Sequence, residues 1–547
     1  MKSTKLGIVW DRLVSIADEM VTSLIRSSFS TLVRESGDLS CVLFDEQGRA
    51  LAQGSFSQPS FTGTAPLTLG HMLAKFPPGA LTAGDILITN DPWMGTGHLF
   101  DISVMMPIMR GGEIVGYAIS VTHLPDIGGL GFGTVARDVY EEGHRIPIQK
   151  LAKAGSLNVD LLEIILENVR AKEMVRGDIL AHVACLKRAE SRVLELLGDY
   201  GMGRLSEAGD GIIDRTQAMI ARRLDGIADF RAGSRMPVEG TDGDLMLEVS
   251  IEKRGREVSV DFAGTDGPVP RGINVPLCYT RAFTLFSFKC LLLPDVPNNQ
   301  AFADFVTVTA PSDCLLNAQP PWPTGGRHII GHFVTPLIFG ALQEQFPDGV
   351  QADCGMLTQI NCQGVARSGR RIATVVFASG GYGALSGHDG QAAVPGPGNM
   401  IGCSAEIVEQ ENEIVVLSKE ILPDSGGAGR FQGGNGQRVM LMNDSGTELS
   451  ISFLSARDRF PPRGFLDGQP GRPRGYRLEG QPISPKGRYA WPPGSVIETL
   501  EAGGGGIGSP ADRDPQQIAA DLASGRITDA FARMHYPGQW KRIRDPA

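Results

Sequence analysis

The sequence contains no CxxC pair, no cluster of basic residues interleaved with aromatic ones, and no apolar run that approaches the ~20 residues needed to cross a bilayer. Its eight cysteines are scattered, which fits neither a zinc knuckle nor a disulfide framework and predicts isolated buried thiols in a reducing compartment. A formal net charge of −10 argues against nucleic acid and anionic membranes as partners. The first thirty residues lack the order of a signal peptide. We therefore expect a soluble, cytoplasmic protein.

Glycine and proline, by contrast, are abundant. The 547 residues include 70 glycines and 35 prolines, which are typical of a fold rich in turns and short strands. The length predicts about two to four structural units. The apolar fraction of 42% is ample for packed cores. We expect an α+β protein built from several units.

Three regions of different character follow one another. Residues 1–230 combine a strand-rich part with long helices, residues 231–400 form a mixed α/β region with a hairpin, and residues 401–547 are β-rich with a glycine-rich tail. Expected helices lie at 9–25, 158–228 (with a break near 198–203) and 327–345, and an amphipathic stretch lies at about 515–535. Expected strands lie at 38–45, 85–89, 102–106, 114–121, 245–251 and 257–262.

Candidate metal ligands gather at the open end of a predicted hairpin. His98 and Asp101 precede its first strand, and His123 follows its second. If Gly111–Glu113 form a three-residue loop, Asp101 falls directly opposite His123, where the two Cβ atoms would be roughly 5 Å apart. A two-residue loop would instead place His123 opposite Phe100. In both registers the ligands lie at the same end of the hairpin.

Two imidazoles and one carboxylate are a common ligand set for a divalent transition metal that keeps open positions for water and substrate. Such an ion can polarise a carbonyl group or activate water. We expect zinc or manganese here. The spacing alone is a weak pattern, because side chains of these types also cap turns and bond to the backbone.

Several motifs occur in the same order along nearly the full chain. They are Arg34-Glu35-x-x-Asp38-x-Ser40, Asn90-Asp91-Pro92 through His98-x-x-Asp101, His123-x-x-Asp126-Ile127-Gly128-Gly129, Pro423–Gly429, and Gly503–Pro510 with Arg513-Asp514. In these motifs the chain resembles the hydantoinase B/oxoprolinase family, which also includes related subunits of acetone and acetophenone carboxylases.

The resemblance implies a two-part enzyme. A hydantoinase A-like partner subunit would bind ATP and activate a carbonyl oxygen by phosphorylation, within a hetero-oligomer. This chain would hold the metal at His98, Asp101 and His123 and complete the reaction. Completion means hydrolysis of a cyclic amide (hydantoin, N-methylhydantoin, oxoproline or another lactam) or carboxylation of a ketone. We expect hydrolysis, the broader branch of the family. Alternatively, this chain binds a metal only structurally and serves as a non-catalytic scaffold for the ATPase partner.

Three carboxylates near these motifs have two interpretations each. Asp38 is a further ligand candidate, because a second carboxylate would balance a divalent ion, or a turn aspartate. Asp126 is a candidate catalytic residue that orients His123 or carries a proton, or it shapes a plain turn. Glu35 is a candidate acid or base, or an exposed residue at a helix end.

Two other features are weaker candidates for chemistry. His328 and His332 have the spacing of a helical metal pair, but packing or substrate contact suits them better because no acidic residue accompanies them. The glycine runs at 380–383 and 503–506 match no phosphate-binding motif, so we expect no cofactor-binding residues for a nucleotide in this chain. Close approach of backbones, at turns or at a seam between subunits, explains these glycines better.

Overall fold

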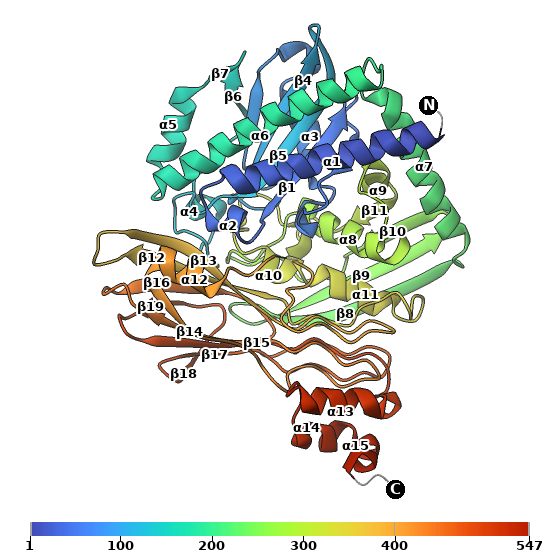
Figure 1. Cartoon of the computed structure of the whole chain (residues 1–547), viewed down its shortest axis with the longest axis vertical. Coiled ribbons are helices and arrows are strands. Elements are labelled where there is room, and N and C mark those ends of the chain that lie inside the picture. The colour runs from blue at the N-terminus through green and yellow to red at the C-terminus, as the bar shows by residue number, and fades with distance from the viewer. Residues whose placement is uncertain (1–2, 399, 545–547) are drawn as a thin grey trace. The chain divides into compact units, whose positions relative to one another are not determined.

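The computed structural model of the chain describes residues 3–398 and 400–544. The chain forms two compact units that together contain helices and several sheets, so the expected α+β class is confirmed (Figure 1). Unit 1 takes in the chain up to Arg231, Ile251–Ala263 and Gly267–Gly331, and unit 2 takes in Ala232–Ser250, Gly264–Asp266 and the chain from His332 onward. The three-region division of the sequence stays a prediction.

A seven-stranded sheet forms the centre of unit 1, with the order β2-β1-β5-β4-β3-β6-β7. Every neighbouring pair in it is antiparallel. The predicted strands of this region are confirmed. The sheet consists of β1 (Leu39–Asp45), β2 (Ala50–Gln53), β3 (Ile86–Thr89), β4 (Asp101–Arg110), β5 (Glu113–His123), β6 (Gln149–Lys153) and β7 (Ser156–Leu157).

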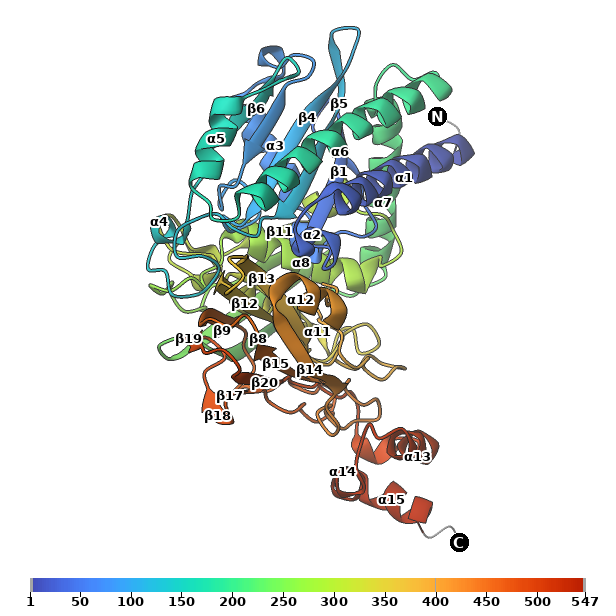
Figure 2. The same cartoon turned by 60° about the vertical axis from the view of Figure 1, so that its left-hand side comes forward.

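Helices cover both faces of this sheet, and β4 and β5 are therefore buried along most of their length. On one face α1 (Ser3–Ser27) lies beside α6 (Lys172–Asp199), as Figures 1 and 2 both show. On the other face α3 (Thr64–Lys75) packs against apolar side chains of β1, β4 and β5. The apolar stripe predicted for the first helix is confirmed, because all five of its residues are buried: Val9, Leu13, Ile16, Met20 and Leu24.

The predicted helical stretch after this sheet is confirmed as three helices, with the break at residues 200–205. Among the remaining helices of unit 1, α7 and α8 are long and the others are short. These helices are α2 (Thr31–Arg34), α4 (Val139–Glu142), α5 (Val159–Glu167), α7 (Ser206–Asp225), α8 (Leu277–Leu292), α9 (Gln300–Asp304) and α10 (His328–Gly331), with 3-10 turns η1 (Pro59–Phe61), η2 (Pro78–Ala80) and η3 (Leu315–Asn317).

A four-stranded sheet has the order β11-β10-β9-β8. Its strands are β8 (Phe230–Glu239), β9 (Asp244–Arg254), β10 (Glu257–Asp261) and β11 (Val306–Thr309). The predicted hairpin is confirmed by β9 and β10, which a two-residue turn joins. The single helix predicted over 327–345 is wrong, because α10 ends at Gly331 and a separate helix, α11, spans Val334–Leu342.

Unit 2 contains two antiparallel sheets around a common apolar core. Side chains from both sheets, such as Ile451 and Ile497, are fully buried in it. One sheet has the order β13-β12-β16-β19 and the other β14-β15-β20-β17-β18. The strands are β12 (Leu357–Val365), β13 (Arg371–Ser379), β14 (Ile414–Ile421), β15 (Gln437–Asn443), β16 (Leu449–Leu454), β17 (Gly475–Leu478), β18 (Gln481–Ile483), β19 (Arg488–Trp491) and β20 (Val496–Leu500), and helix α12 spans Ala405–Asn412.

Glycine-rich segments of unit 2 run side by side as extended backbone. Gly504 donates its N–H to the carbonyl of Gly434 (2.9 Å), and Gly381 donates to Ala502 (2.9 Å). A Cβ added at Gly503 would lie 1.8 Å from the carbonyl oxygen of Ser425. No side chain fits at such a distance, so only glycine allows these backbones to meet. The close backbone approach expected from the glycine runs is confirmed.

The C-terminal helices form a small cluster at one end of unit 2 (Figures 1 and 2). They are α13 (Pro515–Ala523), α14 (Asp529–His535) and α15 (Pro537–Arg544), preceded by the 3-10 turn η4 (Pro510–Asp512). Within the described ranges, none of the helices has the length and apolarity needed to traverse a lipid bilayer. All eight cysteines are free thiols. Six of them are buried, as the sequence predicts, whereas Cys290 and Cys403 are partly exposed.

Candidate metal centre

The β4–β5 hairpin brings two of the predicted ligands together. Asp101 pairs directly with His123, so the predicted register at the open end is confirmed. Of the two loop lengths considered, the shorter one occurs, because Arg110 pairs with Glu113 across a two-residue turn. A bulge at Val115 inserts one extra residue into β5 and restores the register.

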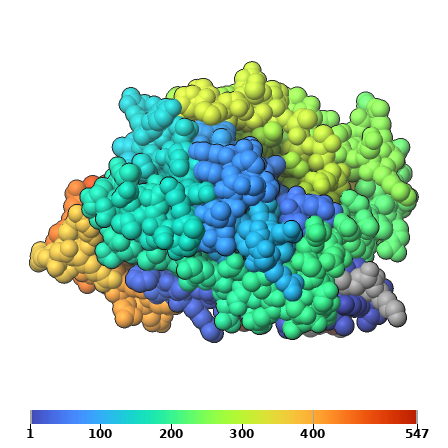
Figure 3. Space-filling model, turned by 90° about the horizontal axis from the view of Figure 1, so that it is seen from above, coloured from blue at the N-terminus to red at the C-terminus, as the bar shows by residue number. Residues whose placement is uncertain are grey.

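Three side chains converge at this end of the hairpin, and all are buried. Nε2 of His98 lies 2.8 Å from Oδ1 of Asp101, and Nδ1 of His123 lies 3.3 Å from the same oxygen. One ligand atom from each residue lies within 4.8 Å of the other two. Figure 3 shows, on the face seen from above, a teal part of the chain beside a blue part nearer its N-terminus.

The contacts of His98 determine which ring nitrogen carries the proton. Nδ1 lies 3.0 Å from the carbonyl oxygen of Gly325. A carbonyl only accepts hydrogen bonds, so Nδ1 is protonated and Nε2 has a free lone pair. Nε2 is buried and makes no hydrogen bond of acceptable geometry among the described residues. A lone pair 2.8 Å from a carboxylate oxygen is unfavourable unless a cation binds both, so this donor set fits a metal ion.

The second oxygen of Asp101 is held by two other groups. The Arg327 guanidinium and the Thr96 hydroxyl each donate to Oδ2 at 2.6 Å. Burial opposes ionisation of Asp101, but the Arg327 guanidinium outweighs it and holds the pKa of Asp101 well below its usual range. Burial, together with Arg327, lowers the pKa of His98 to about 4, so the imidazole is neutral near pH 7. Arg327 therefore keeps Asp101 ionised, with Oδ1 directed at the two histidines.

Asp38 lies beside this group. It immediately precedes β1, and its carbonyl accepts the backbone N–H of His123 (3.2 Å). Its Oδ2 lies 3.4 Å from Nδ1 of His123. Burial raises the pKa of Asp38 to about 6, against the attraction of His123. The position suits a fourth ligand, which stays a prediction.

Aromatic rings line one side of the centre. Phe100 stacks on His123 with ring centroids 5.5 Å apart, and Phe132 meets His98 and His123 edge-on at 6.2 and 5.1 Å. His328 stacks on Phe132 at 5.9 Å. Since α10 ends at Gly331, His328 and His332 do not share the helix that the sequence predicts.

The two predicted acid–base residues lie in different settings. Asp126 is buried, and its carboxylate accepts N–H groups from Gly128 (2.9 Å), Ala171 (3.1 Å) and both backbone and side chain of Arg170. It thereby ties the loop after β5 to the start of α6. Glu35 caps the end of α2, with its side chain 28% exposed and 3.5 Å from the guanidinium of Arg34.

Several residues of the centre are missing from the sequence-based prediction. His182 on α6 contacts the hydroxyls of Ser120 (2.7 Å) and Thr122 (2.8 Å), which fixes β5 just before His123. Arg327 and His182 are remote in sequence from the hairpin. The only signal available for them is that buried polar groups require partners.

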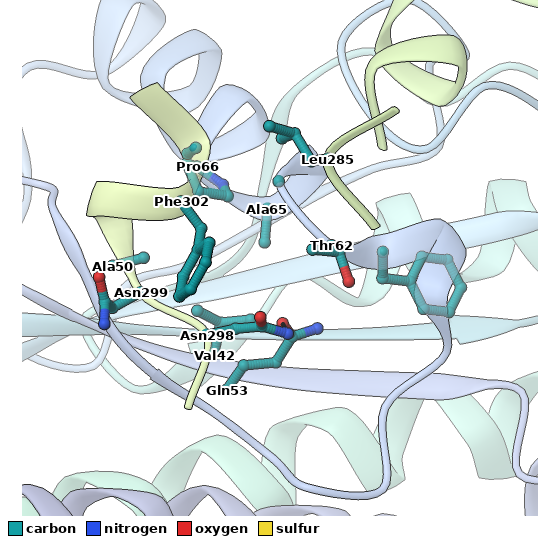
Figure 4. Close-up of a pocket in the computed structure, with 13 residues that line it drawn as sticks. Val42, Ala50, Gln53, Thr62, Ala65, Pro66, Leu285, Asn298, Asn299 and Phe302 are labelled. Carbon is teal, nitrogen blue, oxygen red and sulfur yellow. Dashed lines mark hydrogen bonds between the residues drawn. The ribbon is translucent and has the colours of Figure 1, made fainter. Parts of the chain in front are cut away.

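A small cavity elsewhere in unit 1 is a separate feature (Figure 4). It lies among residues of β1, α3, α8 and α9 and has room for about 20 Å³, about one water molecule. Nδ2 of Asn298 donates to Oε1 of Gln53 at its edge (3.0 Å). None of the predicted metal ligands lines it.

Comparison with known proteins places this geometry in context. The family model described as hydantoinase B/oxoprolinase matches residues 2–510. The putative B chain of a D-/L-hydantoinase from a Pseudomonas species is 26% identical, over 97% of this chain and 94% of the relative. The beta chain of the caprolactamase of Pseudomonas jessenii is 27% identical, over 97% and 95%.

Solved structures show the same fold. The crystal structure of ATP-dependent caprolactamase from Pseudomonas jessenii matches with a TM-score of 0.87 and 24% identity, over 98% of this chain and 96% of that chain. A nucleotide-free acetone carboxylase also matches with a TM-score of 0.87, at 18% identity, over 98% and 79%. The family match extends over most of the chain, and this chain therefore belongs to the hydantoinase B/oxoprolinase family.

Proposed function

We propose that this chain is the metal-binding catalytic subunit of an ATP-dependent cyclic-amide hydrolase. Its relatives include subunits of a hydantoinase and a caprolactamase, which supports an enzyme that opens a hydantoin, oxoproline or other lactam ring. These names also support a hetero-oligomer. The partner is a hydantoinase A-like subunit that uses ATP to activate the carbonyl oxygen.

The observation that carries the proposal is the convergence of His98, Asp101 and His123. Their ligand atoms meet in a buried position, and Nε2 of His98 makes no hydrogen bond of acceptable geometry to another described residue. The set suits zinc or manganese, with Asp38 as the fourth ligand. When bound, a divalent ion supplies Lewis acidity and lowers the pKa of water, which is the chemistry an activated amide carbon requires.

The residues around the ligands have separate proposed roles. Arg327 holds Asp101 in its ionised form, and the rings of Phe100 and Phe132 keep bulk water from the histidines. Asp126 and Glu35 are the proposed acid–base residues. The partial exposure of Glu35 allows proton exchange with solvent, whereas the contacts of Asp126 support a role in holding the loop after His123.

One alternative function has support of its own, and a second is disfavoured. The fold likeness to acetone carboxylase supports an ATP-dependent ketone carboxylase subunit that uses the same centre. A structural metal-binding scaffold for the ATPase partner is the third possibility. The absence of cysteine from the ligand set disfavours it, because structural zinc sites are usually closed by cysteine.

Metal analysis of the purified chain tests the proposal. Wild-type protein should contain about one divalent ion per chain, and His98→Ala and His123→Ala should each lose it. His71→Ala, at an exposed position on α3, is the matched control and should retain the ion. Undiminished metal in both ligand variants would remove the centre from the proposed function.

A further inference from the structure

The side of His98 that faces away from the ligands leads to a buried carboxyl group. The carbonyl of Gly325 accepts from Nδ1 of His98, and the N–H of the same Gly325 donates to Oε1 of Glu142 at 2.5 Å. Glu142 is the last residue of the one-turn helix α4 and is 2% exposed. Glu142 and His98 therefore hold the same glycine from opposite sides.

The contact between α4 and the 321–327 segment is tight and has a second tie. A Cβ at Gly325 would lie 3.0 Å from Oε1 of Glu142, so glycine allows the carboxyl group to reach the backbone. Val139, at the start of α4, donates its N–H to the carbonyl of Pro321 (2.9 Å). The N-cap Asp138 accepts from two N–H groups of the same turn, which fixes α4 itself.

The loop that carries His98 is tied to the same region by Asn90. The amide of Asn90 donates to the carbonyls of Leu99 (2.8 Å) and His144 (3.0 Å) and accepts from the N–H of Ile146 (2.6 Å). A closed circuit of hydrogen bonds therefore runs from His98 through Gly325 to the 142–146 segment and returns through Asn90 and Leu99.

We propose that Glu142 is a positioning residue for the metal centre: it holds the Gly325 carbonyl on Nδ1 of His98 and so keeps Nε2 deprotonated and directed at Asp101. The metal-affinity part of this proposal rests on the proposed function. The tautomer part rests only on contacts within unit 1. Outer groups that orient a histidine ligand typically change metal affinity by about 10- to 100-fold when removed.

Glu142 acts here as a hydrogen-bond acceptor rather than as a charge. Burial raises the pKa of Glu142 to about 8, against the hydrogen bond from Gly325, so the carboxyl is mostly neutral near pH 7. Glutamine has the same length and keeps an acceptor oxygen. Glu142→Gln should therefore preserve the contact, whereas Glu142→Met fills the space without an acceptor.

The first measurement is metal affinity, by competition with a chelator for the full chain. Glu142→Met should weaken zinc or manganese binding about 10- to 100-fold, and Glu142→Gln should stay within about threefold of wild type. Glu239→Met is the matched control, because buried Glu239 accepts N–H groups of Arg459 and Phe460 within unit 2. It should affect stability but not metal affinity.

The second measurement is the tautomer of His98 in metal-free protein, by NMR of chains with 15N-labelled histidine. A His98→Gln spectrum identifies the signal. Wild type and Glu142→Gln should show a protonated Nδ1, and Glu142→Met should show a mixture of tautomers. If Glu142→Met fails to fold, Glu142→Asp withdraws the acceptor by one methylene and should show the same mixture.

The outcomes separate the two proposals. If wild type binds no metal but shows the Nδ1–H tautomer and its dependence on Glu142, the proposed function fails and the positioning role stands. If Nδ1 is unprotonated in wild type, or if folded Glu142→Met retains both tautomer and affinity, the positioning role is wrong. Equal losses in folded Glu142→Gln and Glu142→Met would also overturn it.

Discussion

We expect His182 to make unit 1 sensitive to mild acid. The imidazole is fully buried between α6 and β5, where both nitrogens contact hydroxyl groups, and burial lowers its pKa to about 3. In the unfolded chain its pKa is about 6.5. Below pH 6.5 the unfolded chain binds a proton at His182 that the folded chain does not bind. The stabilisation is therefore complete above pH 6.5 and is lost as the pH falls from 6.5 towards 3.

The size of the effect follows from these two pKa values. At pH 7.5 the full stabilisation is present. Below pH 6.5 it falls by about 1.4 kcal/mol for each pH unit, so at pH 5 about 2 kcal/mol has been lost. Native-state hydrogen exchange, read by mass spectrometry on peptides of β5 and α6, measures it locally, because a chain of two units need not unfold in one step.

The variant for this test is His182→Gln, which removes the titration. Its opening free energy should be lower than that of wild type at pH 7.5, by about 1–3 kcal/mol for the hydroxyls of Ser120 and Thr122 that lose a partner. The opening free energy of His182→Gln should also change less than that of wild type between pH 7.5 and 5. His71→Gln, at an exposed position, should behave like wild type. An unchanged acid sensitivity of the β5 peptides in His182→Gln would refute the reasoning.

Two other predictions concern the metal centre, and a third concerns unit 2. In the assembled complex, Asp101→Ala should spare ADP formation but stop product formation, and product at the wild-type rate would remove the centre from the chemistry. Arg327→Met should cost about 3–5 kcal/mol of unfolding free energy because it leaves the buried Asp101 carboxylate unpaired, and much less beside Asp101→Asn in a double-mutant cycle. Gly503→Ala should prevent folding of unit 2, because its Cβ would lie 1.8 Å from the Ser425 carbonyl, whereas Gly475→Ala has open space. Soluble yield and the thermal transition check this last pair.

Local pattern predicts the ligand hairpin well, but not how its register arises. Gly111 and Gly112 both have positive φ, which suits a two-residue hairpin turn. That turn alone would place His123 opposite Phe100. The bulge at Val115 corrects the offset, and its carbonyl accepts from the N–H of Leu205. A partner ninety residues away in the chain leaves no trace in the local pattern.

The groups that support the ligands are harder to predict for the same reason. Buried Asp101 requires a cationic partner. The need for such a partner can be predicted from the sequence, but not which residue supplies it. Arg327 lies in the segment noted for its histidines, yet the helix assumed there was wrong. Glu142 reaches His98 only through a backbone group of Gly325, and no side-chain pattern reports such a contact.

The glycine segments of unit 2 also determine when that unit can form during synthesis. Residues 380–383, 425–436 and 502–508 bond to one another through backbone groups, although long stretches of chain separate them. Contacts between such distant segments form late, because the intervening chain must lose conformational entropy before the contacts can stabilise the fold. Residues 502–508 leave the ribosome long after residues 380–383. We therefore expect hairpins such as β12–β13 to form during translation before the glycine segments join.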